Sequence, residues 1–174
     1  MDWMDKVGGI LQQYSGSASP QGIESQAPAD VSQHFENVSR AAPESVLAQG
    51  LSEAFRSNQT PSFGQMVGSL FQKSDPEQKT GILNRLLTAA GPSASAWLAS
   101  RGQSGLVVGP SQVNPQAAAE VSPETVSELA SHAQNQSPSI VDEVSSFYAQ
   151  HPVLVKGLGA AALAIAMSKM SRAA

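Results

Sequence analysis

The side chains best suited to metal binding or acid–base chemistry are scattered along this chain. The three histidines, His34, His132 and His151, are far apart, and none stands in an H-E-x-x-H pattern or another spacing typical of metal ligands. There is no cysteine, which excludes disulfides, thiolate metal sites and cysteine nucleophiles. We therefore predict no metal site, and we interpret each histidine as a helix-surface or capping residue.

Other catalytic patterns are incomplete. Residues 102–105, Gly-Gln-Ser-Gly, approach a serine-nucleophile motif but lack the strand-to-helix turn that the motif requires. The neighbouring acids Asp142 and Glu143 would diverge on a helix, so they do not form a catalytic carboxylate pair. We predict no catalytic residue and expect a protein that is not an enzyme. An active site assembled in space from scattered polar groups is the alternative left open.

One short motif imitates a nucleotide-binding loop. Gly157, Gly159 and Ala162 fit the pattern G-x-G-x-x-A after an apolar run. That mechanism needs a strand before the glycines, a second strand, and an acid about 20 residues further on. Here Pro152 is placed to start a helix, and no acid follows Glu143. We therefore expect no nucleotide and no other cofactor.

The composition favours association between protein molecules rather than binding to a charged partner such as nucleic acid. Of the 174 residues only 14% are charged, 41% are hydrophobic and 5% are aromatic. The ten basic residues are dispersed and the net charge is −4, so we expect no nucleic-acid partner. Because charge repulsion keeps protein molecules apart, a surface with few charges favours association. The amino-terminal residues lack a basic segment followed by an apolar stretch, and we expect a cytoplasmic protein.

The elements that would position any site are predicted to be helices. A helix-capping residue followed by proline recurs at Asp75-Pro76, Ser122-Pro123, Ser137-Pro138 and His151-Pro152. At the first of these, Gln78 is placed to close a capping box with Asp75. Apolar residues recur at helical spacing between these starts. The predicted fold is all-α: a multi-helix bundle with a central hydrophobic C-terminal helix and a tethered N-terminal amphipathic helix.

Composition shifts divide the chain into five predicted segments. These are an amphipathic helix (residues 1–14), a flexible Ser-, Gly- and Pro-rich linker (15–29), a helical domain (30–102), a second linker (103–121) and a C-terminal three-helix segment (122–174). The apolar residues 106–108 have no partner strand, so we interpret them as loop.

The last predicted helix runs from Pro152 to about Met170 and is almost entirely apolar from Gly157 onward. It is shorter than the roughly 20 residues of a membrane span and is interrupted by Lys156. A helix apolar all round needs apolar neighbours on every side. Few large side chains are available elsewhere, so we expect one face to pack within the chain and another against a second copy. The residues expected at its centre are Leu154, Leu158, Ala161 and Ile165.

The N-terminal helix is predicted to have one apolar face. Trp3, Val7, Ile10 and Leu11 recur at helical spacing. We expect them to dock on a neighbouring subunit, and the alternatives are a first core helix or a membrane contact. The membrane alternative conflicts with Lys6 being the only cation there, accompanied by two acids.

Part of the sequence resembles a known family. Residues 47–57 (LAQGLSEAFRS), 60–67 (TPSFGQMV), the helix start at 74–76 and the opening residues 5–11 (DKVGGIL) look like the uncharacterised bacterial YidB-like proteins. The resemblance covers about half of the chain, and from Ser122 onward the sequence departs from the family. It implies a bacterial, cytoplasmic, helical protein and supplies no catalytic residues.

These observations favour a non-enzymatic structural protein that forms a homo-oligomer or polymer through apolar helix packing, with itself as partner. The second hypothesis is a peripheral membrane or adaptor protein that uses the N-terminal amphipathic helix as its contact.

Overall fold

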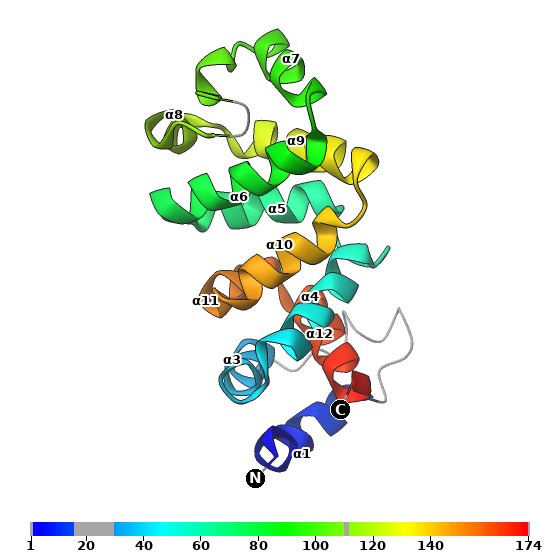
Figure 1. Ribbon diagram of the computed structural model, residues 1–174. Helices are drawn as coiled ribbons and strands as arrows, with labels where there is room; N and C mark the ends of the chain where they lie inside the picture. Colours follow the sequence, from blue (N-terminus) through cyan, green and yellow to red (C-terminus); the bar gives the residue numbers. More distant parts are fainter. Residues whose placement is uncertain (1, 16–29, 110–111, 174) are drawn as a thin grey trace. The chain divides into compact units, whose positions relative to one another are not determined.

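The computed structural model describes residues 2–15, 30–109 and 112–173. Over these residues the chain is all-α, and its β structure is limited to one isolated bridge between Val107 and Val113 (Figure 1). This confirms the predicted fold class. The predicted linker 15–29 lies outside the described residues, except for Ser15 at the end of the first helix.

The chain forms two compact units whose limits differ from the predicted domains. Unit 1 consists of residues 1–62 and 145–174, and unit 2 of residues 63–144. Each unit therefore takes part of the predicted helical domain 30–102 and part of the predicted segment 122–174. The reason is that helices distant in sequence pair with each other, as the following paragraphs describe, and composition alone carries no record of that pairing.

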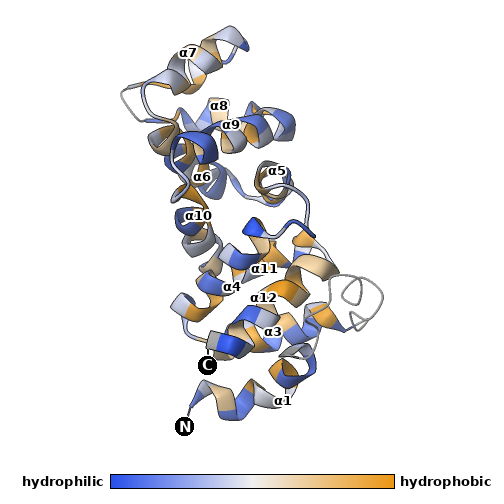
Figure 2. Ribbon diagram, turned by 90° about the vertical axis from the view of Figure 1, so that its right-hand side faces the viewer, coloured by the Kyte–Doolittle hydropathy of each residue, from blue (hydrophilic) through white to orange (hydrophobic). Residues whose placement is uncertain are grey.

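In unit 1 the last helix, α12 (Ala160–Ala173), is covered by three other helices. It packs against α1 (Trp3–Ser15), α3 (Val31–Ala41) and α4 (Glu44–Arg56). Residues 162–168 and Met170 are all buried, although hydrophobic residues surround most of the α12 axis (Figure 2). For residues 162–168 the expectation that one chain cannot cover the apolar stretch is therefore wrong, because α1, α3 and α4 supply the apolar surface.

The predicted single helix from Pro152 to Met170 is also wrong. The structure has α11 (Pro152–Val155), a 3₁₀ turn η2 (Lys156–Leu158) and then α12. The break lies at Gly159, whose φ of +96° is far from the value near −63° that an α-helix needs. Glycine adopts such a conformation readily because it has no Cβ.

Unit 2 contains α5 (Phe63–Lys73), α6 (Pro76–Ala90), α7 (Ser93–Ser100), α8 (Pro115–Glu120) and α9 (Pro123–Gln136). The division between the units falls within α10 (Ile140–Ala149). The predicted capping box is present, since the Asp75 side chain accepts from the Gln78 amide and the Gln78 side chain bonds the Asp75 amide. Ser122 likewise caps α9 by accepting from the amide of Thr125.

Residues 103–109 and 112–121, predicted as a linker, fold onto unit 2. They form a 3₁₀ turn η1 (Ser104–Leu106), the isolated bridge and α8. The backbone amide of Val113 donates to the Asn84 side chain of α6 at 3.1 Å. Leu106, Val113 and Ala118 are buried. These apolar residues give the segment its order, although serine, glutamine and proline dominate its composition.

Glycines allow the main helix pairs to approach closely. On α4, a Cβ added to Gly50 would lie 2.7 Å from the carbonyl oxygen of Ala166 on α12. On α5, a Cβ at Gly64 would lie 2.4 Å from the carbonyl oxygen of Ser127 on α9, and one at Gly68 would lie 2.7 Å from that of Pro123. Each unit is therefore built around a helix pair that requires glycine at the contact.

We predict that Gly64→Ala destabilises the protein by about 1–3 kcal/mol, because the new methyl group would overlap backbone that can move only with α9. Urea denaturation followed by circular dichroism measures the change. Ser69→Ala is the matched control, since Ser69 is exposed on the same helix and its replacement should change stability by less than about 0.5 kcal/mol. Equal stabilities of the two variants would contradict the close contact.

Candidate interaction surfaces

The apolar face of α1 lies on its own chain. Val7 and Leu11 are 3% and 1% exposed, and Tyr14 is buried beside them. The hydroxyl of Tyr14 lies 2.8 Å from Nδ1 of His34 on α3. Burial and the negative charge of Asp30 raise the pKa of the Tyr14 hydroxyl, so it stays protonated at neutral pH. The apolar face of α1 therefore packs on a surface formed by α12 and α3.

In this single chain the placement matches the alternative of a first core helix, and docking on a neighbouring subunit stays a prediction. Of the four residues predicted to make that contact, Val7 and Leu11 are buried within the chain, whereas Trp3 and Ile10 are half-buried. The distribution follows from the amphipathic pattern, since the centre of an apolar stripe is covered first and its edges stay partly open.

A second surface lies where the apolar C-terminal region breaks. We define the α11 surface as Val153, Leu154, Leu158, Ala160 and Ala161. The Val153 side chain is 77% exposed, and Ala160 is also exposed. The predicted contact residues Leu154, Leu158 and Ala161 are all half-buried. The fourth, Ile165, is buried in the core at 8% exposure.

The charge closest in sequence to this surface takes part in an ion pair. Lys156 of η2 makes an ion pair with Glu36 of α3, and Arg40 pairs with the same carboxylate. The hydrogen bond from Lys156, the charge of Lys156 and the charge of Arg40 lower the pKa of the Glu36 carboxyl. Lys156 is the only ionisable residue among residues 152–161. The other side chains of this segment are all apolar.

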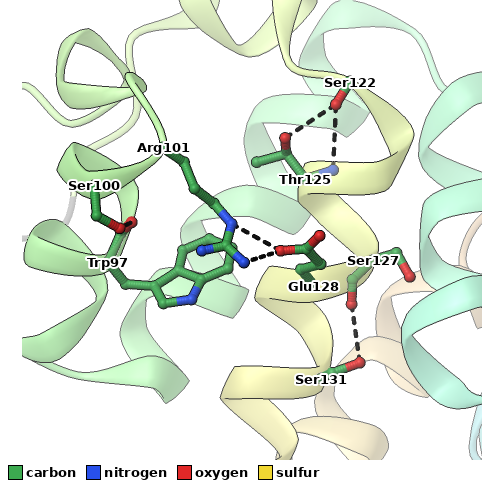
Figure 3. Close-up of polar contacts among 8 residues, drawn as sticks. All are labelled: Trp97, Ser100, Arg101, Ser122, Thr125, Ser127, Glu128 and Ser131. Atoms are coloured by element: carbon green, nitrogen blue, oxygen red, sulfur yellow. Dashed lines mark hydrogen bonds and ion pairs between the residues drawn. The ribbon is translucent and has the colours of Figure 1, made fainter.

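In unit 2, long side chains join α7 to α9. The Arg101 guanidinium lies 4.0 Å from the centre of the Trp97 ring, and its Nε donates to Glu128 at 2.7 Å (Figure 3). One turn along α9, the His132 ring stacks on Trp97 with a centroid separation of 5.9 Å. Ser93 contacts His132 at 3.3 Å. Each group has a partner in this arrangement, which is explained by its role in holding α7.

One concave site in unit 2 is lined mainly by small and apolar residues. A pocket of about 510 Å³ lies between the end of α6 and the start of α7; its lining residues are Leu87, Thr88, Gly91, Pro92, Ala94, Ser95 and Val107. This lining contains no ionisable side chain.

Across residues 2–15, 30–109 and 112–173, no three histidine or acidic side chains are grouped to hold a metal ion. Within the same ranges, no helix has the length and hydropathy needed to cross a bilayer.

Sequence reasoning missed the contact between α7 and α9, although a signal for it exists. Trp97 and Arg101 are four residues apart, as are Glu128 and His132, so each pair lies on one helix face. The spacing indicates two matching faces, but it does not say that they meet. The exposure of Val153 was also missed.

A comparison with protein-family models, curated proteins and solved structures found no significant match to this chain. The resemblance to YidB-like proteins therefore stays a prediction.

The ion pair at Glu36 predicts a specific dependence of stability on pH. Since the folded-state pKa of Glu36 is lowered from 4.5, its stabilising contribution is complete above pH 4.5 and is lost as the pH falls through the lower folded value. Thermal melting followed by circular dichroism should show a steeper loss below pH 4.5 for the wild type than for Glu36→Gln. Glu120→Gln, at an exposed position in unit 2, should retain the wild-type slope. Parallel curves for the wild type and Glu36→Gln would contradict this assignment.

Proposed function

We propose that this protein is a non-enzymatic structural protein that associates with copies of itself through the α11 surface. The observation that carries the proposal is the 77% exposure of Val153 in an apolar stretch where Leu154 and Leu158 are only half-buried. Single exposed apolar residues are common on protein surfaces, whereas contiguous ones favour a contact. Association would remove this surface from water at a gain of roughly 25 cal/mol per Å².

The chemistry of the α11 surface favours a second copy as its partner. The residues of the α11 surface carry no charge that would select a charged partner, and the nearby Lys156 is paired with Glu36. A twofold dimer places the same patch on both sides of the interface, and an uncharged apolar patch is complementary to itself. A stable contact needs about 800 Å² per partner, so residues flanking the α11 surface would also take part.

The membrane hypothesis receives no comparable support. It requires the apolar face of α1 to enter a bilayer, yet Val7, Leu11 and Tyr14 are buried against the rest of unit 1. Binding of that kind would first have to remove α1 from its seat.

We predict that Val153→Glu shifts the protein from oligomer to monomer and weakens association by at least about tenfold, because two like charges would face each other without water. Light scattering coupled to size-exclusion chromatography over a micromolar concentration series measures the shift. Val108→Glu is the matched control, since Val108 is 66% exposed but lies in unit 2. The proposal is wrong if the wild type is monomeric throughout the series, or if both variants assemble as it does.

A further inference from the structure

The α1 seat, defined as the surface of α12 and α3 that α1 covers, is a binding site for one known helix. It buries Val7, Leu11 and Tyr14 to 3%, 1% and 2% exposure, and His34 meets the Tyr14 hydroxyl. The seat is therefore complementary to α1 in both shape and hydrogen bonding. A second copy of the chain carries the same helix, so a copy of α1 from another molecule fits the seat equally well.

The helix that occupies the seat contains two glycines that packing does not require. A Cβ added to Gly8 or Gly9 would meet nothing within 4 Å. Neither glycine has a positive φ, so its backbone conformation is open to other residues. This contrasts with Gly50 and Gly64, where a Cβ would overlap a neighbouring helix. The effect of Gly8 and Gly9 is to lower the stability of α1, which favours its release from the seat.

The connection between α1 and the rest of the chain is long enough for transfer to another molecule. Residues 16–29, fourteen in number, separate Ser15 from Asp30. A chain of that length spans at most roughly 45–50 Å. The segment contains no charged residue other than Glu24. Its covalent length therefore permits α1 to reach a seat on a neighbouring copy.

We propose that α1 is exchanged between two copies of this chain, each copy inserting its α1 into the seat of the other. Every contact of α1 is kept in the exchanged dimer, so the balance between closed monomer and dimer depends on protein concentration and on the connecting segment. This interaction does not rest on the α11 surface. If both contacts operate, the two surfaces join one copy to different neighbours.

Crosslinking of full-length chains tests the exchange. The natural chain has no cysteine, and Gln13 and Gln33 are exposed positions adjoining Tyr14 and His34. A Gln13→Cys chain is mixed with a Gln33→Cys chain of different mass and treated with a short bismaleimide. Exchange predicts a mixed dimer in a yield about tenfold or more above that of a Gln13→Cys and Gln136→Cys mixture, which measures random collision. Gln136 is exposed in unit 2.

Two further variants complete the test. A single chain carrying both Gln13→Cys and Gln33→Cys should crosslink within itself, which shows that the reagent spans the two positions. Gly8→Ala with Gly9→Ala should slow formation of the mixed dimer by roughly 10–30-fold by strengthening α1. The exchange is refuted if the single chain crosslinks efficiently while the mixed dimer stays at the collision level. A mixed dimer that persists in the Val153→Glu background separates this contact from the α11 surface.

Discussion

The burial of α12 is the constraint on which the rest of unit 1 depends. Its residues 162–168 are all buried, and such a helix is stable in water only when other apolar surfaces surround it. Helices α1, α3 and α4 surround it, although they lie more than 100 residues away in sequence. Because the final helix needs the first ones, the two ends of the chain fold as one unit.

Close approach is achieved in the same way in both units. Gly50 lets α4 approach the backbone of α12, and Gly64 with Gly68 lets α5 approach α9. The chain has few aromatic residues to fill wide gaps, so close backbone contact replaces large side chains as the source of packing. In a chain of this composition, a methyl group added where two helices cross disturbs their packing more than a methyl group added at the surface.

Features that depend on residues close in sequence were predicted correctly. Features that depend on contacts between distant residues were not. The capping box of Asp75 and Gln78 and the cap at Ser122 involve residues three apart, and both were predicted correctly. The break at Gly159 was missed because glycine occurs inside helices here as well, at Gly50 among others. The location of α1 was left open between alternatives, because an amphipathic pattern identifies an apolar face without identifying the surface that covers it.

The exposure of Val153 follows from the burial of Val155 on the same short helix. Residues two apart on a helix differ by about 200° around the axis, so they face nearly opposite directions. Val155 is completely buried, and therefore Val153 faces outward. The ion pair between Lys156 and Glu36 fixes the following turn to α3, which keeps this orientation. A polar side chain would satisfy the fold equally well at Val153, so the valine is not required by packing within the chain.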